Sequence, residues 1–440
     1  MISIVLPSLN SIEYISDCLD SIVKQTLQPL ELICVDAGSE DGTIDILKKY
    51  KNAYGWIHII TSHVRSYGYQ VNLGIDHAKG KYLMVVESDD ILPKDACKIL
   101  FDAITRYGAD FVRGSMMDFL HYNGKNVGYV KSYYYSDEET DRLINLIENP
   151  VCRRINTLCI QASIYDMDFI KKCGIELHDS GGASYQDTGF CLQVSSLAKT
   201  CSFVNDIVYY RRRGNEGSSY FVGDNYVKII DEYKWIAKKL SIADNEIITR
   251  NLIFYTKLYS YYWMLARIRA ELRPAFISSI QRELDYYDVL GCKLNDNEEL
   301  MLSELRGRTE FSEAIERKYN NIEQIIRWID YGSIVVFGIG RLGKTFVENL
   351  KCVQSIFNKS IIEAICDNND DLIGTKIYDN EIISVETAVR DFTDSQYIVV
   401  NKRETEDMKK QLLNLGIREN QIFLVSSMDI FDFEREIIRC

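Results

Sequence analysis

The sequence predicts an α/β protein that contains two parallel-sheet units separated by a helical region. In the first third of the chain, short apolar runs alternate with segments whose apolar residues have helical spacing. The same alternation starts again at Ser333, whereas the residues from Tyr226 to about Tyr331 combine helical spacing with few prolines. Strands separated by helical segments are typical of a mostly parallel sheet.

The N-terminal unit is expected to start with a buried strand and then to alternate regularly. Strands are predicted at Ile2–Leu6, Leu30–Val35, Trp56–Thr61, Tyr82–Val86 and Asp110–Gly114. Helices are predicted at Glu13–Gln25, Ile44–Tyr50, Gln70–Ala78 and Ala96–Arg106. The helical segments repeat their apolar residues every three to four positions, whereas the strands are short continuous apolar runs.

The length of 440 residues suits two or three domains of roughly 100–200 residues each. We place the domains at 1–222, 223–330 and 331–440. Within the helical domain, Tyr255–Trp263 is rich in aromatic residues and is followed by several arginines. Two interpretations stay open for this segment: a helix buried against the N-terminal domain, or a platform for an acceptor or a membrane surface.

The third unit has a glycine-rich loop between a strand and a helix, with Asp367 at the end of the next strand. The loop, Gly338-x-Gly340-x-x-Gly343, has the context that a dinucleotide-binding fingerprint requires. The unit is short, which suits one mononucleotide half rather than a full dinucleotide domain. Two roles stay open: a second phosphate site at Gly338, Gly340, Gly343 and Asp367, or a structural role that includes forming a homo-oligomer. The absence of a following Tyr-x-x-x-Lys disfavours redox chemistry.

Composition narrows the function classes further. The 64 Asp and Glu residues outnumber the 51 Lys and Arg residues, for a net charge of −13, which argues against a nucleic-acid binder. The 12 cysteines form no C-x-x-C pair, and the five histidines show no zinc spacing. The chain begins without a signal-like segment and has no apolar run near the ~18 residues of a membrane span. We therefore expect a cytoplasmic protein with reduced thiols, and leave association with the inner face of the membrane open.

Polar residues follow three predicted strands of the N-terminal unit. They are Pro7-Ser8-Leu9-Asn10, Asp36–Thr43 and Glu87-Ser88-Asp89-Asp90. Each segment alone is compatible with a helix cap, a turn or a solvated loop, but the ends of parallel strands meet in one crevice. Carboxylates that converge there repel one another unless a cation is present. Mg²⁺ or Mn²⁺ usually takes one or two protein carboxylates and completes its shell with water and substrate phosphates. The cluster thus predicts a phosphate-bearing substrate.

These motifs, together with Asn72-Leu73-Gly74-Ile75 and Ala78–Tyr82, resemble the ordered motif set of family 2 glycosyltransferases. The resemblance covers roughly residues 1–220 and implies a GT-A fold, which is a single Rossmann-like nucleotide-sugar domain. The C-terminal unit resembles the small Rossmann-like domains that are appended to bacterial surface-sugar enzymes.

The resemblance also implies roles for individual residues at the donor site. Asp89 would bind the Mn²⁺ or Mg²⁺ ion, and Glu87 would lie near the ribose of the donor. Asp36 would bond the base, with Asp41 nearby, and Asp90 would extend the cluster toward the sugar. The remaining donor-binding residues on this side are Pro7, Ser8, Asn10, Asn72 and Ser88.

Two later segments complete the expected site. Gly182–Phe190 resembles the family's later acidic motif, which implies that Asp187 is the general base that takes the proton of the acceptor hydroxyl; the alternative is a helix cap at Thr188. The segment from Tyr209 to Ser219 resembles the Tyr-Arg…Ser closure of the family. It implies that Arg211 and Arg213 clamp the diphosphate, whereas a solvated basic turn is the favoured interpretation of Arg212.

The sequence departs from the family at two places. Glu87 replaces the first aspartate of the D-x-D motif. The usual Ala-Arg-Asn before the central helix is replaced by Gln70-Val71-Asn72, so that the family's arginine is missing. The preceding Ser66–Tyr69 could supply different contacts to the donor.

The resulting hypothesis is an inverting glycosyltransferase that moves a sugar from a nucleotide-diphosphate sugar to a hydroxyl acceptor. The acceptor would be a glycan, a lipid-linked molecule or a protein, and the product a bacterial surface polysaccharide or glycoconjugate. A sugar nucleotidyltransferase is the first alternative, but it would need a glycine-rich, arginine-containing loop where Pro7–Asn10 stands. A non-catalytic nucleotide-sugar-binding scaffold is the second, and the presence of Asp89 and Asp187 disfavours it.

Overall fold

The structure is a computed structural model, and it divides into two compact units that are described separately. The first unit lies within Met1–Asp118 and Lys131–Glu310, and the second within Phe119–Val130 and Phe311–Glu436. The described residues are 1–28, 30–122, 125–132, 140–149, 152–153, 160–212, 226–240, 246–268, 272–285, 294, 296–307, 333–340, 343–344, 346–347, 362–377, 379–401 and 405–425. The described cysteines are free thiols.

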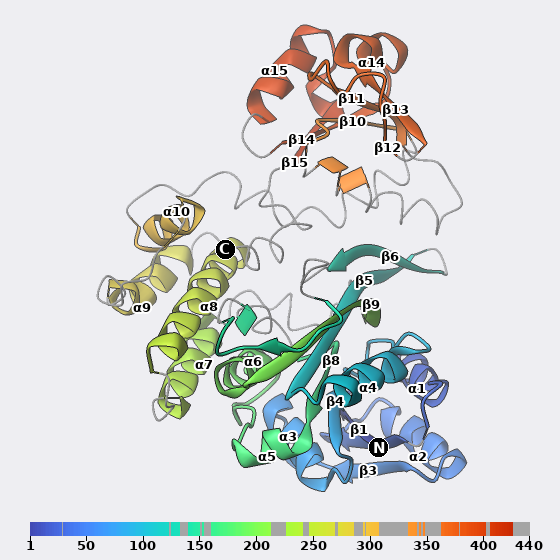
Figure 1. Cartoon of the computed structure of the whole chain (residues 1–440), viewed down its shortest axis with the longest axis vertical. Coiled ribbons are helices and arrows are strands. Elements are labelled where there is room, and N and C mark those ends of the chain that lie inside the picture. Colours follow the sequence, from blue (N-terminus) through green and yellow to red (C-terminus); the bar gives the residue numbers. More distant parts are fainter. Residues whose placement is uncertain are drawn as a thin grey trace. The chain divides into compact units, whose positions relative to one another are not determined.

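The first unit is built on a mixed sheet whose N-terminal half is parallel (Figure 1). The strand order is β3-β2-β1-β4-β8-β5-β9-β7, with β6 paired to β5. The parallel strands are β1 (Ile2–Ser8), β2 (Leu30–Asp36), β3 (Ile57–Thr61) and β4 (Tyr82–Val85). The other strands are β5 (Phe111–Tyr122), β6 (Lys125–Ser132), β7 (Ile144–Asn145), β8 (Ser163–Asp166) and β9 (Thr200–Arg212).

Antiparallel pairing changes the direction of the sheet after β4. β8 pairs antiparallel with both β4 and β5, and β7 pairs antiparallel with β9. The predicted strand at Asp110–Gly114 corresponds to the start of β5, whereas β8 and β9 were not predicted. Because of this arrangement, late segments of the chain return beside the carboxyl ends of β1 and β4.

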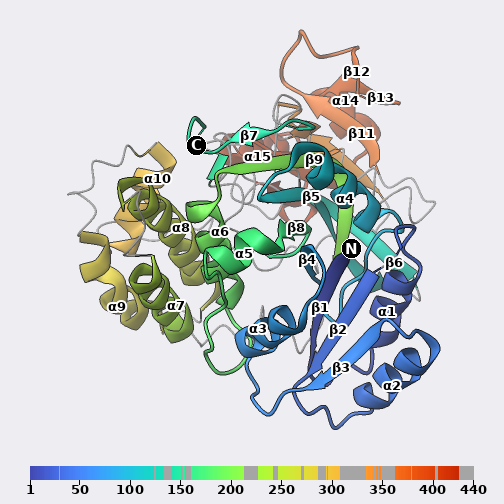
Figure 2. The same ribbon diagram turned by 60° about the horizontal axis from the view of Figure 1, so that its bottom comes forward.

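Helices cover the sheet of the first unit (Figure 2). Their bounds are α1 Ile15–Val23, α2 Thr43–Ala53, α3 Tyr67–His77, α4 Ala96–Tyr107, α5 Met167–Lys172 and α6 Gln186–Leu197. The spacing of the apolar residues explains why these segments are helical. In α1, for example, Ile15, Leu19 and Ile22 are fully buried and lie on one face.

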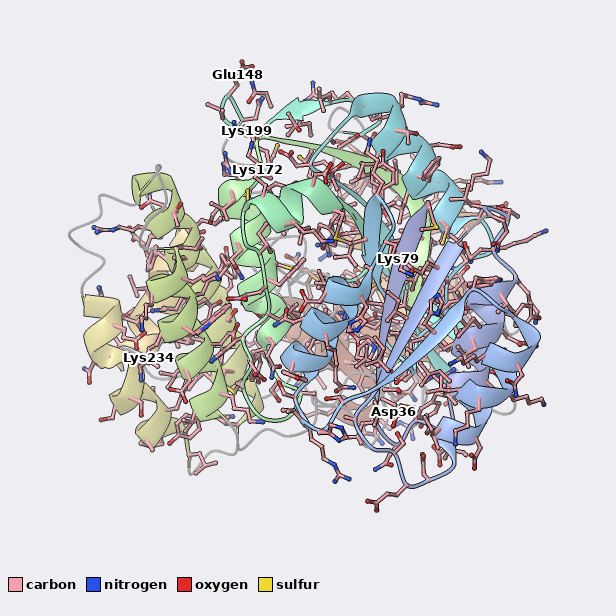
Figure 3. All side chains as sticks on the ribbon, turned by 90° about the horizontal axis from the view of Figure 1, so that it is seen from below. Asp36, Lys79, Glu148, Lys172, Lys199 and Lys234 are labelled. Atoms are coloured by element: carbon pink, nitrogen blue, oxygen red, sulfur yellow. The ribbon has the colours of Figure 1, made fainter. Side chains whose placement is uncertain are left out.

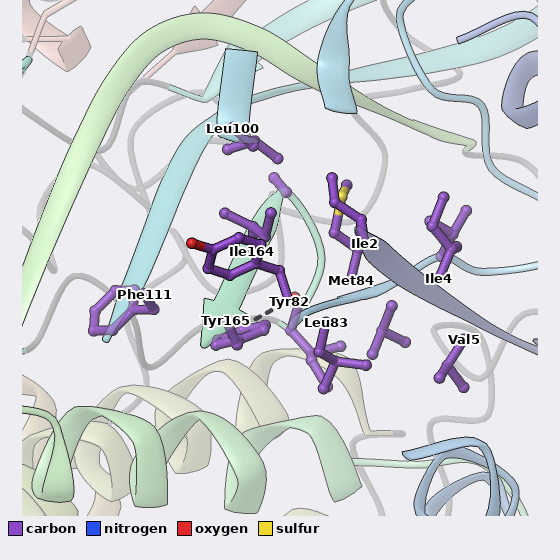
Figure 4. Close-up of a cluster of buried hydrophobic side chains, with 14 of the residues drawn as sticks. Ile2, Ile4, Val5, Tyr82, Leu83, Met84, Leu100, Phe111, Ile164 and Tyr165 are labelled. Atoms are coloured by element: carbon purple, nitrogen blue, oxygen red, sulfur yellow. Dashed lines mark hydrogen bonds between the residues drawn. The ribbon is translucent and has the colours of Figure 1, made fainter. Parts of the chain in front are cut away.

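The core of the first unit lies where the central strands meet (Figure 4). Ile2 and Ile4 of β1 pack beside Leu83 of β4, and the aromatic rings of Phe111 and Tyr165 extend the cluster toward β5 and β8. These five side chains are fully buried. A rigid apolar centre of this kind fixes the strand ends that carry the polar residues.

The helical region belongs to the first unit and packs on α6. Its helices are α7 (Tyr226–Lys239), α8 (Glu246–Arg267), α9 (Arg273–Asp285) and α10 (Asp296–Leu305). Both α7 and α8 contact α6. The aromatic positions Tyr255, Tyr259, Tyr261 and Tyr262 of α8 are buried, which favours the interpretation of a helix packed against the N-terminal domain.

The second unit contains a smaller Rossmann-like sheet of order β12-β13-β11-β10-β14-β15. Its strands are β10 (Ile334–Phe337), β11 (Ile362–Asp367), β12 (Lys376–Ile377), β13 (Asn380–Ser384), β14 (Gln396–Val400) and β15 (Ile422–Val425). All pairs except β12–β13 are parallel. The helices α14 (Val385–Asp391) and α15 (Thr405–Asn414) pack on this sheet. The predicted class of an α/β protein with a GT-A-like unit, a helical middle and a smaller C-terminal unit is confirmed.

Among the described residues, no helix combines the length and the apolar character that crossing a bilayer requires.

Candidate donor and catalytic site

The ends of β1 and β2 are joined by hydrogen bonds to Asp36, which is labelled in Figure 3. The Asp36 carboxylate is 1% exposed and accepts from the Ser8 hydroxyl at 3.0 Å. It also accepts from the backbone N–H groups of Gly38 and Ser39 and from the Ser39 hydroxyl. Asn10, with a positive φ of 51°, accepts from the Glu40 N–H. The first two predicted loops therefore form one folded rim, with Pro7 buried beneath it.

Asp41 has the capping role that the sequence left open for it. One carboxylate oxygen accepts from the backbone N–H and the hydroxyl of Thr43, at the start of α2. The other accepts from the Ile12 N–H at 2.9 Å. Asp41 thus joins α2 to the loop that follows β1, and its contact with a donor stays a prediction.

Glu87 follows β4 and is held by two residues that the donor set from the sequence did not include. Its Oε1 atom accepts from the Tyr67 hydroxyl at 2.6 Å and from the Gln161 side-chain amide at 2.8 Å. Burial raises the pKa of Glu87 to about 7, and the negative charge of Asp89 adds to the effect. Tyr67 lies in the Ser66–Tyr69 segment that we expected to supply different contacts. No motif in the sequence around Gln161 indicated that this residue contacts Glu87.

Asp90 is the most deeply held member of the acidic strand end. It is 3% exposed, and its two oxygens accept from the Tyr209 hydroxyl at 2.8 Å and from the Arg212 N–H at 2.7 Å. Burial raises the pKa of Asp90 well above its usual range. Asp90 therefore fastens the strand end to β9. The neighbouring Ser88 bonds the Ser11 hydroxyl at 2.6 Å, which ties the strand end to the loop after β1.

Asp89 lies between these two held carboxyls and is half-buried. Its backbone carbonyl accepts from Arg212 Nε at 2.8 Å. The negative charge of Asp89 contributes to the raised pKa values of both Glu87 and Asp90. Both oxygens of Asp90 and one oxygen of Glu87 accept from protein donors. The role of Asp89 as the ligand of a hard cation stays a prediction.

The surroundings of Asp89 limit how a cation could be held there. The described residues contain no group of three or more His, Cys, Asp and Glu side chains able to hold a metal ion. Mg²⁺ and Mn²⁺ sites that use one or two carboxylates take their remaining ligands from phosphates and water. The donor set at Asp89 therefore fits an ion that binds together with a diphosphate.

Asp187 is the second residue of α6, and it faces the acidic strand end. Its Oδ1 atom accepts from the Thr188 N–H at 2.9 Å. Asp187 is not the cap of a helix that starts at Thr188, because α6 already begins at Gln186 and Tyr185 is its N-cap. Burial raises the pKa of Asp187 to about 6, while the positive charge of Arg211 opposes the shift. The negative charge of Asp187 in turn raises the pKa values of Glu87 and Tyr67. The late acidic motif is therefore close enough to the strand end for their charges to interact.

Gln186 anchors the loop that precedes Asp187. Its side chain is 1% exposed and donates to Ser180 and to the Gly182 carbonyl, while its oxygen accepts from the Ser184 N–H. The Gly182 carbonyl also accepts from the Tyr67 N–H at 2.9 Å. Gln186 and the start of α3 thus hold the same loop, although the sequence did not single out Gln186 as a functional residue.

The described arginines near the end of β9 both bond within the protein, and the contact of Arg211 with the diphosphate stays a prediction. Arg211 forms a two-pronged ion pair with Asp118, with distances of 2.7 and 3.0 Å. Arg212 is 8% exposed and binds the acidic strand end, and its guanidinium lies 4.8 Å from the centre of the Tyr14 ring. The interpretation of Arg212 as a solvated turn is therefore wrong. Arg213 lies outside the described residues.

Gln70 and Asn72 of α3 bond to the protein backbone. The missing family arginine corresponds to Val71, and the preceding Gln70 donates to the carbonyls of Ser8 and Val35 at 3.0 and 2.7 Å. Asn72 donates to the Leu177 carbonyl and accepts from the Leu177 N–H, both at 2.8 Å. Asn72 thus fixes the loop before α6, and its predicted contact with the donor is not among these bonds.

In the second unit, the glycine-rich loop is tied to Asp367. Its carboxylate accepts from the Ile339 N–H at 2.5 Å and from the Asn369 N–H at 2.8 Å. Gly338 has a positive φ of 98° and donates to the Cys366 carbonyl. The four residues of the second phosphate site predicted above are close together, and the binding of a phosphate there stays a prediction.

A Rossmann-like half-sheet with an acidic strand end, faced by a half-buried aspartate from a later helix, is the arrangement of a GT-A nucleotide-sugar domain. Residues 3–162 match the model of the family "Glycosyl transferase family 2", and residues 331–423 match "C2185-like, N-terminal". Residues 3–162 thus form a glycosyl transferase family 2 domain, which is followed by a separate α/β domain. The match supports glycosyl transfer and disfavours the nucleotidyltransferase alternative, whereas a non-catalytic scaffold would carry the same domain and is separated from an enzyme by the turnover test below.

Two curated relatives and one solved structure illustrate the similarity. Glycosyltransferase GlyG of Streptococcus pneumoniae is 29% identical over 219 residues, which cover 48% of this chain and 71% of that protein. The poly(ribitol-phosphate) beta-glucosyltransferase of Bacillus spizizenii is 28% identical over 268 residues, which cover 59% of this chain but only 40% of the relative. The structure of S. aureus TarS 1–349 in complex with UDP-GlcNAc has a TM-score of 0.53 and 19% identity, and the match covers 74% of this chain and 91% of that one.

Proposed function

We propose that this protein is an inverting glycosyltransferase in which Asp187 is the general base. The observation that carries the proposal is the half-buried Asp187 carboxyl at the start of α6, close enough to the Glu87–Asp90 strand end for its charge to raise the pKa of Glu87. A donor diphosphate at the strand end and an acceptor hydroxyl at Asp187 would then lie on opposite faces of the transferred sugar. That arrangement supports a single in-line displacement with inversion at the anomeric carbon.

The protein's own residues suit the proton transfer that this reaction requires. A sugar hydroxyl is a poor nucleophile, and a positioned carboxylate accepts its proton as the new bond forms. With a pKa raised to about 6, Asp187 is ionised at neutral pH and is a stronger base than an exposed aspartate. Glu87, held by Tyr67 and Gln161, and Asp90, held by Tyr209, would keep the strand end in place during the reaction.

A divalent cation, Mn²⁺ or Mg²⁺, would bind at Asp89 with the donor diphosphate and would neutralise the charge that develops on the leaving group. Arg211 is the nearest candidate for a further contact with the diphosphate, because its charge already reaches Asp187. Such a contact would require Arg211 to share its guanidinium between Asp118 and the donor.

The relatives suggest the substrate class. The TarS structure contains UDP-GlcNAc, and the Bacillus spizizenii relative is named for transfer to poly(ribitol-phosphate). We therefore propose a UDP-hexose or UDP-N-acetylhexosamine donor and a polyol-phosphate or glycan acceptor of a bacterial surface polymer. Lipid-linked and protein acceptors belong to the same hydroxyl class.

The test combines a binding screen with one variant. The purified protein is first screened by thermal shift against UDP-, GDP- and dTDP-sugars, with and without Mn²⁺, and the stabilising donor is then used for turnover. Asp187→Asn should retain donor binding but lose turnover by about 10²- to 10⁴-fold, because only the proton transfer is removed. An Asp187→Asn enzyme with full turnover would show that the base has been wrongly assigned.

A further inference from the structure

Glu232 of α7 is buried against the helix that carries Asp187. It is 1% exposed, and a methyl group at Gly189 of α6 would overlap its Oε1 atom. The same methyl group would lie 3.1 Å from Cζ3 of Trp235. Because Gly189 is only two residues from Asp187, the missing side chain at Gly189 lets a buried carboxyl approach the first turns of α6.

The two oxygens of Glu232 have different surroundings. Oε2 lies 2.9 Å from Nδ1 of His178, whose ring stacks on Trp235 with a centroid distance of 4.8 Å. Oε1 has no hydrogen-bond partner among the described residues. Glu232 is therefore held at one oxygen by His178, while the other oxygen is pressed against α6.

His178 connects this pair to the donor side of the site. Leu177, the residue before it, is bonded through both its N–H and its carbonyl to Asn72 of α3. A methyl group at Gly68, in the first turn of α3, would overlap the His178 carbonyl oxygen. That first turn also contains Tyr67, which donates to Glu87. One continuous set of contacts therefore runs from the acidic strand end through α3 and His178 to Glu232 and α6.

The charges around the pair favour a neutral state. Burial raises the pKa of Glu232 to about 8, and the negative charge of Asp187 adds to it. Burial also lowers the pKa of His178, although the charges of Asp179 and Asp231 oppose this. Burial therefore favours the uncharged forms of both groups, and the 2.9 Å contact between Oε2 of Glu232 and Nδ1 of His178 is then a hydrogen bond between neutral partners.

The lysines of α7 and α8 that lie nearest this region, Lys228 and Lys257, interact with groups other than Glu232. Lys228 of α7 donates to the Gly181 carbonyl. From α8, Lys257 lies against the ring of Tyr233 and pairs with Glu283. Asp187 is thus the only other carboxylate whose charge contributes to the raised pKa of Glu232.

We propose that Glu232 is a positioning residue that, together with His178, holds the first turns of α6 and keeps Asp187 aimed at the acceptor hydroxyl. The role rests on the proposed function of Asp187 as the base. Glu232 acts through Asp187 and contacts no donor atom. Its neutral form leaves Asp187 as the single negative charge of the pair, whereas an ionised Glu232 would place a second buried charge beside it.

The sign of the pH effect on stability follows from this. The folded-state pKa of about 8 lies above the ordinary value of 4.5, so that the folded protein keeps a proton that the unfolded chain releases. The contribution of Glu232 to the free energy of unfolding is therefore largest below about pH 4.5. This contribution decreases steadily as pH rises toward about 8. Glu232→Gln keeps the shape and the donor to His178 but cannot ionise.

The first measurement needs no ligand. Melting temperatures of the full chain are compared for the unaltered protein, Glu232→Gln and the control Asp45→Asn, which removes an exposed carboxylate of α2 whose charge is not among those that shift the pKa of His178 or Glu232. The melting temperature of Glu232→Gln relative to the unaltered protein should rise as pH increases from about 5 to about 9, and that of Asp45→Asn should not. A difference that stays constant across this range would overturn the proposal.

The second measurement is the pH profile of turnover, followed as UDP release from UDP-GlcNAc with Mn²⁺ or from the donor found in the screen. Glu232→Gln should keep turnover within about 3-fold at neutral pH and lose less at alkaline pH than the unaltered protein. Glu232→Ala should lose turnover on the order of 10- to 100-fold, as expected for a misplaced base.

The outcomes separate this proposal from the one on which it rests. A fully active Asp187→Asn enzyme would overturn the base, and with it the role of Glu232. An inactive Asp187→Asn enzyme, together with superimposable pH profiles for Glu232→Gln and the unaltered protein, would overturn the role of Glu232 alone.

Discussion

The two Rossmann-like units each carry carboxylates at the ends of parallel strands, but the units hold these charges differently. In the second unit, Asp367 accepts from the backbone N–H groups of Ile339 and Asn369, which lie in the loops at the ends of β10 and β11. In the first unit, Asp89 lies between the half-buried Glu87 and the buried Asp90, whose pKa values its charge helps to raise. A strand-end carboxylate that accepts hydrogen bonds from the N–H groups of adjacent loops holds those loops in place. A strand-end carboxylate that lies beside other carboxylates instead favours the binding of a cation.

The comparison also applies within the first unit. Asp36 resembles Asp367, because it is buried and accepts from backbone N–H groups of the following loop. The presence of an aspartate at a strand end therefore does not by itself identify a ligand site. The charge of neighbouring carboxylates is a second guide, because the charge of Asp89 raises the pKa values of both Glu87 and Asp90.

The largest expected effect separates Asp89 from Asp367. Asp89→Ala should abolish the dependence of UDP binding on Mn²⁺ and lower turnover on the order of 100-fold or more, because charge on the leaving diphosphate would be left unneutralised. Asp367→Ala should leave turnover unchanged. The measurement is donor turnover as a function of Mn²⁺ concentration. Unchanged metal dependence in Asp89→Ala would show that the cation binds elsewhere.

The next effect concerns pH and the base. Because the pKa of Asp187 is raised to about 6, turnover should be full above this value and fall about tenfold per pH unit below it. The effect of pH on stability has the opposite direction, because the folded-state pKa of Asp187 exceeds the ordinary value of 3.8. The contribution of Asp187 to the free energy of unfolding therefore decreases as pH rises from about 4 to about 6. Turnover profiles and melting curves over the same buffers check both signs. An acid limb retained in Asp187→Asn would assign that limb to another group.

Sequence reasoning located the strand ends of the site because they depend on local patterns. The polar residues after β1, β2 and β4 follow directly from the alternation of apolar strands and helices, and the parallel sheet brings them together. Asp187 was found through its motif. The chemistry of these residues could therefore be predicted before their contacts were known.

The supporting residues could not be found in this way, since they are fixed by long-range packing. Gln161 lies 74 positions from Glu87, and Arg212 lies 122 positions from Asp90. Antiparallel strands that the local pattern did not reveal bring both residues to the site. Glu232 looks like an ordinary polar residue of a helix, and only the packing of α7 on Gly189 shows that it is buried.

The smallest expected effect tests whether the glycine loop of the second unit is shaped by packing or by a ligand. A methyl group at Gly343 would overlap the Gly338 carbonyl oxygen, whereas a methyl group at Gly340 would meet no atom within 4 Å. Gly343→Ala should therefore destabilise the second unit by about 1–3 kcal/mol, because the backbone must move to relieve the overlap. Gly340→Ala is the matched control and should change stability by less than about 0.5 kcal/mol.

Hydrogen exchange followed by mass spectrometry measures this prediction in the second unit alone. Gly343→Ala should lower protection in β10, β11 and β14, and leave the first unit unchanged. The glycine pattern of the loop also predicts a phosphate site. If a phosphate binds there, UDP or inorganic phosphate should raise the hydrogen-exchange protection of the Ile339 N–H. A bound phosphate would compete for this N–H with the Asp367 carboxylate, which accepts it in the structure. Equal protection in the two glycine variants would contradict the packing argument, because the overlap exists at only one of the two positions.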